Sequence, residues 1–178
     1  PAIIGGDEKS RHGVVLAKSS PAKAYGIRTG EPVAAALRKC PFLVMEPPDH
    51  ALYRKRSREL MDFLSTYTSD LEQLSVDECF MDFGPISHRF SSPLEAALQI
   101  KDRVREQMGF TVNIGISTNR LLAKMASDFE KPDRVHTLFP DEIQEKMWPL
   151  PVDELYMVGH SSALRLHALG IHTIGDLA

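Results

Sequence analysis

The stretch LSVDECFMDF (residues 74–83) places two acids, Asp77 and Glu78, side by side in an otherwise apolar run. Neighbouring side chains of a regular strand point to opposite faces of the sheet, so a straight strand could not aim both carboxylates at one target. Ser and Asp favour tight turns, and residues 75–78 therefore predict the tip of a β-hairpin. At such a tip the turn breaks the alternation, and both acids can face one cleft.

Taken by themselves, these two carboxylates leave two interpretations open. Carboxylates held on a rigid hairpin beside phosphate-binding cations suit Mg²⁺, which takes a few carboxylate oxygens and completes its shell with water and substrate phosphates. A solvated turn without chemistry is the alternative and, on these residues alone, the more frequent case.

The composition indicates a globular protein with a core of its own. The 178 residues are 43 % hydrophobic and 25 % charged, and this length suits one large domain or two small ones. No apolar run approaches the roughly 18 residues that span a bilayer, and the first residues show no signal-peptide pattern. We therefore expect a cytoplasmic protein with no membrane partner, whose two cysteines, Cys40 and Cys79, stay reduced.

The first part of the chain has the pattern of a small α/β segment. Two apolar runs separated by Gly5-Gly6 and a charged turn at residues 7–12 predict a pair of strands. Two short helices and another strand follow. The expected elements are strands at 2–4 and 13–17, helices at 21–25 and 32–39, and a strand at 43–45.

From Asp49 onward, longer helices and strands alternate. Asp49 is a suitable N-cap, and Ser92-Pro93-Leu94-Glu95 has the sequence of a capping box. Beyond the hairpin, we expect a helix at 49–67, a helix from 93 with a buried stripe (Leu94, Ala97, Leu98, Ile100, Lys101 and Val104), a strand at 111–116, a helix at 119–129 and a strand at 135–139. This order is that of a split βαβ sheet that lacks its first strand.

The character of the chain changes at Phe139, where we place a domain boundary. Short helices broken by prolines follow, and residues 139–178 carry two Lys or Arg against six acids. The net charge of the chain is -3, so no general attraction draws it to nucleic acid.

Four segments together resemble the Y-family DNA polymerases, the translesion enzymes, in their UmuC-like and DinB-like group. SVDECFMDF resembles the family signature S-[IV]-D-E-x-[YFL]-[LM]-D, and AKAYGIRTG (residues 22–30) resembles the finger motif E-A-[RK]-x-[FLY]-G-[IV]-[RK]-x-G. VNIGIS (residues 112–117), followed by Asn119, Ala123, Lys124 and Ala126, resembles V-x-x-G-I-[SA]-x-[NT]-[KR]-x-[LF]-A-K-x-A. Lys131-Pro132 resembles the lysine-proline pair that comes next. The matches keep the family's order and spacing and cover nearly the whole chain, which outweighs the solvated-turn interpretation.

The resemblance implies an α+β fold with three parts. These are small α/β fingers at 1–49, a polymerase palm at 50–138 with a split βαβ (ferredoxin-like) antiparallel sheet whose first strand is missing, and the start of a helical, helix-hairpin-helix thumb at 139–178. It also implies template-directed, error-tolerant DNA synthesis in DNA repair and the SOS response. The implied partners are primer–template DNA and a dNTP, and a sliding clamp would bind regions absent from this chain.

The family's catalytic roles transfer to the acidic pair. Asp77 is implied to bind two Mg²⁺ ions, and Glu78 to join it as a metal ligand and to assist activation of the primer 3′-hydroxyl. In such two-metal transfer, one ion lowers the pKa of the attacking hydroxyl and the other stabilises the leaving pyrophosphate.

Further residues are implied to contact the substrates. Lys131 matches a lysine that contacts the triphosphate. Lys23 stands where many members have Arg, and a lysine there can neutralise a phosphate but lacks the bidentate fork of Arg. Ser20 takes a position that is often Tyr in the DNA polymerase IV branch, and residues 19–23 resemble the Gram-positive UmuC-like branch. Lys124 and Gly159 are assigned to DNA. Without the motifs, the lysines would be ordinary surface residues.

Departures from the family pattern carry expectations of their own. The motif D-x-x-x-F-[YF]-[AV]-[SQ], which supplies a third metal carboxylate and a steric gate, is not found, so we expect a chain truncated at its N-terminal end, a weak metal site and no polymerisation by this chain alone. The family's little finger is also absent, so we expect truncation at the C-terminal end as well. In the thumb, Met157 replaces the first glycine of G-[VI]-G before Val158 and Gly159. A phosphate contact and a purely structural helix-turn-helix both remain open there.

Two other functions fit part of the pattern. The missing carboxylate would suit a non-catalytic DNA-binding or interaction module. Nucleotidyl cyclases share the palm and its two-metal chemistry, although the finger and thumb matches argue against them.

Overall fold

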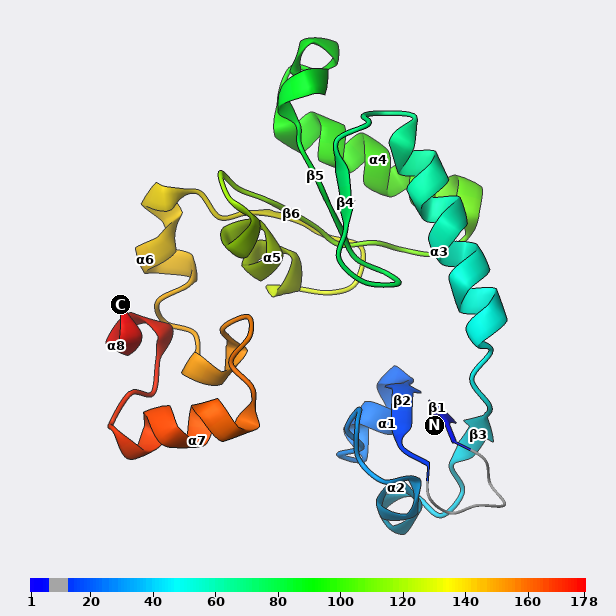
Figure 1. Ribbon diagram of the computed structural model, residues 1–178. Coiled ribbons are helices and arrows are strands. Elements are labelled where there is room, and N and C mark those ends of the chain that lie inside the picture. Colours follow the sequence, from blue (N-terminus) through cyan, green and yellow to red (C-terminus); the bar gives the residue numbers. More distant parts are fainter. Residues whose placement is uncertain (7–12) are drawn as a thin grey trace. The chain divides into compact units, whose positions relative to one another are not determined.

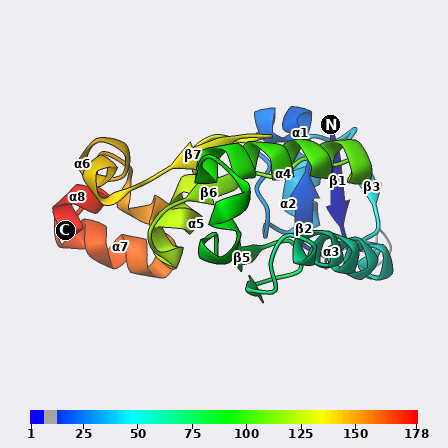
Figure 2. The same cartoon turned by 90° about the horizontal axis from the view of Figure 1, so that it is seen from above.

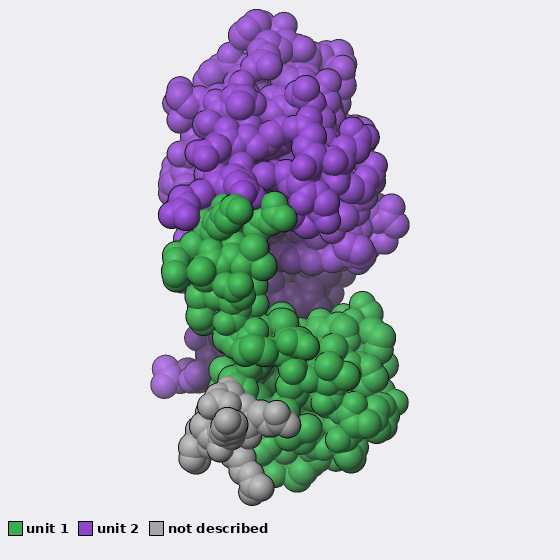
Figure 3. Space-filling model, turned by 90° about the vertical axis from the view of Figure 1, so that its right-hand side faces the viewer, with its two compact units in different colours: residues 1–56 green, residues 57–178 purple. Residues whose placement is uncertain are grey.

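The computed structural model describes residues 1–6 and 13–178 (Figure 1). The charged turn expected at 7–12 lies outside these residues. The chain divides into two compact units, residues 1–56 and 57–178, which Figure 3 colours separately. The division falls within helix α3 (His50–Ser65), and the assignment of fingers, palm and thumb to 1–49, 50–138 and 139–178 stays a prediction.

The first unit is built on a three-stranded sheet. Strand β1 (Ala2–Gly5) lies between β2 (Val15–Lys18), which is antiparallel to it, and β3 (Val44–Glu46), which is parallel. The helices α1 (Ser20–Ala24) and α2 (Val33–Lys39) complete the unit. The buried core unites both kinds of element: Ile3, Val15, Ala22, Ile27, Val33, Ala36, Cys40 and Leu43. All five elements expected here from the sequence are present, with ends within one or two residues.

In the second unit, two long helices pack with a hairpin. The hairpin joins β4 (Leu71–Gln73) and β5 (Cys79–Met81), which pair antiparallel. Helix α3 and helix α4 (Pro93–Met108) share a core with the 3₁₀ turn η1 (Gly84–Arg89), and the hairpin packs against it. Asp49 caps α3 as expected, since its carboxylate accepts from the Leu52 N–H at 2.9 Å. The helix ends at Ser65, two residues earlier than its expected end.

Helix α4 corrects two expectations. Ser92 caps it by accepting from the Glu95 N–H at 3.1 Å, but Glu95 accepts from the Ser91 N–H and hydroxyl instead of closing the capping box on Ser92. Leu94 and Leu98, expected in the buried stripe, are exposed. The helix instead buries the face of Ala96, Ala97, Ile100, Lys101 and Val104. Spacing alone did not distinguish this face from its neighbour, because both contain apolar residues three and four apart.

A parallel βαβ unit follows α4. Strand β6 (Ile114–Ile116) leads into α5 (Arg120–Asp128) and then into β7 (Val135–Thr137), which pairs parallel with β6 (Figure 2). Asn119 caps α5 through its side-chain oxygen, which accepts from the Leu122 N–H at 2.9 Å. The strand expected at 111–116 is shorter than predicted. The β4–β5 and β6–β7 pairs form two separate ladders within the described residues.

Short helices form the end of the chain. They are η2 (Pro140–Glu142), α6 (Ile143–Lys146), η3 (Val152–Glu154), α7 (His160–Ala168) and α8 (Ile174–Leu177). The segments around α6 and α8 pack on α5, whose Leu122, Met125 and Ala126 share a buried cluster with Leu138, Met147 and Ile174. Helix α5 therefore packs both against the β6–β7 pair and against part of the C-terminal helical segment. Among the described helices, none has the length and apolarity needed to cross a membrane.

Candidate active site

The turn of the β4–β5 hairpin carries the two acids. The Leu74 and Ser75 N–H groups both donate to the Glu78 carbonyl, at 2.9 and 3.2 Å, and close the loop between the strands. Asp77 is exposed, and its carboxylate accepts from the Ser75 hydroxyl at 2.9 Å. Both acids therefore lie outside the regular strands, which confirms the predicted hairpin and removes the restriction that strand alternation would impose on them.

Helix α5 approaches β6 so closely that only glycine fits at position 115. A Cβ built on Gly115 would lie 1.9 Å from the Ala123 carbonyl oxygen and 2.5 Å from the Ser127 nitrogen. Both are main-chain atoms of α5, so the glycine of VNIGIS is a packing requirement. This close approach fixes Lys124, the residue after Ala123, with respect to the rest of the unit.

Lys124 connects the helix to the acidic hairpin. Its ammonium donates to Glu78 Oε1 at 2.6 Å and lies 3.0 Å from Asp128 Oδ2. The Lys124 side chain is 12 % exposed, whereas that of Glu78 is 39 % exposed. Burial lowers the pKa of Lys124, but its hydrogen bonds with Glu78 and Asp128 outweigh burial, so this pKa lies above its ordinary value of 10.5. The group therefore carries a full positive charge at neutral pH.

Asp128 extends this network to Lys131. Lys131 Nζ lies 2.6 Å from Asp128 Oδ1, and the Lys131 side chain is 57 % exposed. Burial raises the pKa of Asp128, but the hydrogen bonds from Lys131 and Lys124 lower it more, and the result lies below its ordinary value of 3.8. Glu78, Lys124, Asp128 and Lys131 thus form a chain of alternating charges, from the hairpin to the residue that the resemblance assigns to the triphosphate.

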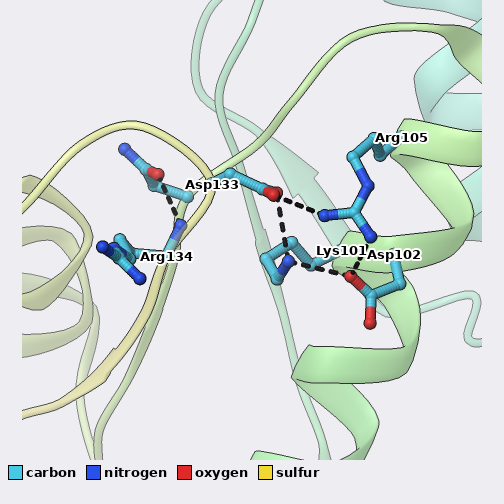
Figure 4. Close-up of polar contacts among 6 residues, drawn as sticks. Lys101, Asp102, Arg105, Asp133 and Arg134 are labelled. Carbon is cyan, nitrogen blue, oxygen red and sulfur yellow. Dashed lines mark hydrogen bonds and ion pairs between the residues drawn. The ribbon is translucent and has the colours of Figure 1, made fainter.

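A second ionic cluster holds the segment just after Lys131 (Figure 4). Asp133 binds two basic residues of α4, with Lys101 Nζ at 3.1 Å and Arg105 Nη1 at 2.6 Å. Asp102 binds the same two residues, each at 2.9 Å. Hydrogen bonding by Lys101 first, and by Arg105, holds the pKa of Asp133 below its ordinary value. The Lys101 side chain, only 9 % exposed, is thus a buried cation with two carboxylate partners, which fixes the segment that carries Lys131.

The remaining predicted site residues lie elsewhere. Ser20 and Lys23 are exposed on α1 in the first unit, where Ser19 rather than Ser20 caps the helix. Gly159 is the N-cap of α7, with no side-chain cap bond. Met157 has a φ of 73° and is 83 % exposed. Its backbone therefore takes the left-handed conformation that favours the glycine for which it substitutes.

Two charged residues that link α5 to other parts of the site, Asp128 and Arg120, were not predicted as site residues. Asp128 lies four residues after Lys124 and three before Lys131, so helical spacing alone could have indicated both ion pairs. Arg120 donates to Glu72 of β4 at 2.9 Å and so adds a second link between α5 and the hairpin. Its partner is 48 residues away in the sequence, and no local pattern reveals that contact.

The acidic hairpin offers oxygen donors of the kind that Mg²⁺ requires. Within the described part of the chain, no three His, Cys, Asp or Glu side chains gather as a metal-binding group. Asp77 and Glu78 provide two carboxylates, one of which already contacts Lys124. Such a pair fits an ion that completes its shell with substrate phosphates and water, which is how Mg²⁺ is commonly bound.

Comparison with known proteins agrees with this geometry. Residues 1–128 match the impB/mucB/samB family, and residues 140–171 match the helix-hairpin-helix motif of the same family. The chain is 56 % identical over its whole length to a protein of Clostridium acetobutylicum named DNA polymerase IV, and 40 % identical to one of Bacillus subtilis named DNA polymerase IV 1. It spans 45 % and 43 % of these relatives.

Solved structures show the same fold. The crystal structure of DinB from Sulfolobus solfataricus superposes with a TM-score of 0.87 at 27 % identity, over 99 % of this chain and 52 % of that one. A structure described as an insertion ternary complex of Dbh DNA polymerase gives a TM-score of 0.82 at 25 % identity, over 99 % and 52 % of the two chains. The predicted α+β polymerase fold and the resemblance to the Y-family DNA polymerases are thus confirmed, and the chain belongs to the impB/mucB/samB family.

Proposed function

We propose that this chain carries the catalytic hairpin of a template-directed, error-tolerant DNA polymerase, which transfers deoxynucleotides to a primer 3′-hydroxyl. The observation that carries the proposal is the β4–β5 turn, which presents Asp77 and Glu78 beside the lysine-bearing helix α5. The relatives named DNA polymerase IV support it. The chain spans less than half of each relative. We therefore propose the activity for residues 1–178 only when they are joined to the further segments that the full-length relatives contain.

Each residue of the site has a proposed task. Asp77 and Glu78 would hold Mg²⁺ together with substrate phosphates and water, and the bound ion would lower the pKa of the 3′-hydroxyl and stabilise the leaving pyrophosphate. Lys131 is exposed and would neutralise the triphosphate, whereas the same task for Lys23 of the first unit is a prediction from the family resemblance alone. Ser20 is proposed as a further nucleotide contact. Oxygen donors alone favour Mg²⁺ over softer metals.

DNA would be contacted through the C-terminal helices. Gly159 begins α7, and the main-chain N–H groups at a helix start suit a phosphate. Primer–template DNA and a dNTP are the proposed partners, supported by the polymerase complex among the structural neighbours. A cytoplasmic location, a role in the SOS response and the UmuC-like placement of residues 19–23 stay predictions from the family resemblance.

A chimaera tests the function directly. Residues 1–178 replace the matching segment of the Clostridium acetobutylicum relative, and primer extension is measured with Mg²⁺ and dNTPs. Asp77→Ala is expected to reduce the extension rate by about a hundredfold or more, because an electrostatic contact to the reacting groups is lost. Glu130→Ala removes an exposed carboxylate that pairs with Arg134 and serves as the matched control.

The two variants separate a catalytic loss from a folding defect. The Glu130→Ala chimaera should extend primers at the parent rate. The proposal fails if the Asp77→Ala chimaera is equally active, or if the folded parent chimaera extends no primer. The 178-residue chain by itself is predicted not to extend primers.

A further inference from the structure

Glu78 makes a contact that metal binding has to change. Its carboxylate Oε1 accepts from the partly buried ammonium of Lys124 at 2.6 Å, so a positive charge already lies where a divalent cation would be attracted. A cation at Glu78 and the ammonium of Lys124 repel each other, and in a partly buried site that repulsion is weakly screened.

Lys124 also has a second acceptor within reach. Its Nζ lies 3.0 Å from Asp128 Oδ2, on the next turn of the same helix. If the bond to Glu78 breaks, the ammonium keeps this partner and is not left buried without one, which would otherwise be costly. The exchange therefore needs only a small movement of one side chain.

The helix itself holds Lys124 in place. Gly115 allows the backbone of α5 to lie directly on β6, and the Lys124 side chain is 12 % exposed. A lysine built for a DNA phosphate would present its ammonium to solvent, as Lys131 does with 57 % exposure. The burial and the two carboxylate partners of Lys124 favour a role inside the site.

We propose that Lys124 is a positioning residue that competes with divalent metal for Glu78, so that metal binding transfers its ammonium to Asp128. The proposal rests on the proposed function, because it takes Glu78 as a metal ligand. It also links the two ends of the network: when Lys124 turns fully to Asp128, it competes with Lys131 for that carboxylate and favours release of Lys131 toward a phosphate. Metal binding and phosphate binding then support each other.

Mn²⁺ binding by the 178-residue chain tests the competition without any catalysis. Free Mn²⁺ is counted by electron paramagnetic resonance for the parent, Lys124→Met, Lys124→Arg and the control Lys146→Met. Lys146 is paired with Glu142 and Thr137, not with the hairpin. Lys124→Met should bind Mn²⁺ about tenfold tighter, as expected for removing one charge a few ångströms away in a medium of intermediate dielectric constant. The arginine variant and the control should resemble the parent.

The direction of the change decides the outcome. A merely structural lysine would loosen the hairpin on removal and weaken Mn²⁺ binding, so equal or weaker binding by Lys124→Met overturns the proposal. If the parent shows no detectable binding, Lys124→Met must gain it; no binding by either also overturns the proposal. Circular dichroism verifies that each variant is folded, and Lys124→Gln replaces the methionine variant if that one is not.

Asp128→Asn provides an independent check. It removes the second acceptor, so Lys124 should hold Glu78 more firmly and Mn²⁺ binding should weaken about threefold or more. In the Lys124→Met background the same change should have a clearly smaller effect, and an equal effect in both backgrounds contradicts the exchange. The primer-extension loss of the Asp77→Ala chimaera is measured separately, so the proposed function can stand if the role of Lys124 fails.

Discussion

Replacing Gly115 with alanine tests the packing on which the site depends. The added Cβ would lie 1.9 Å from the Ala123 carbonyl oxygen, whereas an ordinary contact begins at 3.4 Å. The helix α5 must therefore move away by about 3.4 minus 1.9, or 1.5 Å, unless β6 moves instead. Because both colliding atoms belong to the main chain, no change of rotamer relieves the clash.

The expected cost lies at the upper end of overpacking, about 3 kcal/mol. For a chain of this length, each kcal/mol corresponds to about 2–4 °C, so the melting temperature should fall by about 6–12 °C. A movement of α5 by this distance would also break the 2.6 Å hydrogen bond between Lys124 and Glu78. Mn²⁺ affinity should therefore change together with stability.

Thermal unfolding followed by circular dichroism measures the effect. Gly159→Ala is the matched control, because a Cβ there meets nothing within 4 Å and the residue has a φ of -83°. That variant should lose less than about 1 kcal/mol, which includes the weaker capping by alanine. If Gly115→Ala melts within 2 °C of the parent, α5 does not lie as close to β6 as described.

Three further predictions concern the backbone at Met157, stability at acid pH and the proposed triphosphate contact. Met157→Gly should raise the melting temperature by about 1–4 °C, because it removes a left-handed non-glycine residue whose side chain is 83 % exposed; a lower melting temperature would contradict this. The pKa values of Asp128 and Asp133 are lowered on folding, so their stabilising effect is complete above the ordinary value of 3.8 and is lost as the pH falls through their folded values. Melting curves from pH 7 to pH 2.5 should thus show a stability difference between the parent and Asp133→Asn that becomes smaller toward the acid end. In the chimaera, Lys131→Ala should raise KM for dNTP about tenfold or more while a Lys146→Ala control does not, and an unchanged KM would exclude Lys131 from the triphosphate site.

The sequence predicted helix starts well where a single N-cap residue determines them. Asp49, Ser92 and Asn119 each accept a hydrogen bond from a main-chain N–H of the helix that they precede, and such caps act within four residues of sequence. The hairpin was predictable for the same reason, because its turn is formed by the residues that specify it. Even the burial of Lys101 followed from its place in the helical pattern.

Contacts between distant segments were not predictable. Leu94 and Leu98 were assigned to the buried face, and only the packing partners of α4 show that a neighbouring face is covered. The motif containing Lys124 identified an important lysine, but its partner Glu78 lies 46 residues earlier. That pairing depends on how closely α5 lies on β6, which a single sequence does not reveal.

If Asp77 of the hairpin binds the catalytic metal, its replacement by a softer ligand should change which metal supports activity. In the chimaera, Asp77→Cys replaces a hard oxygen ligand with a thiolate, which prefers softer ions to Mg²⁺. Primer extension should be lost with Mg²⁺ and partly restored by Mn²⁺ or Cd²⁺, whereas Asp77→Ala should not be restored. Full activity of Asp77→Cys with Mg²⁺, or equal rescue of the alanine variant, would show that Asp77 does not hold the metal.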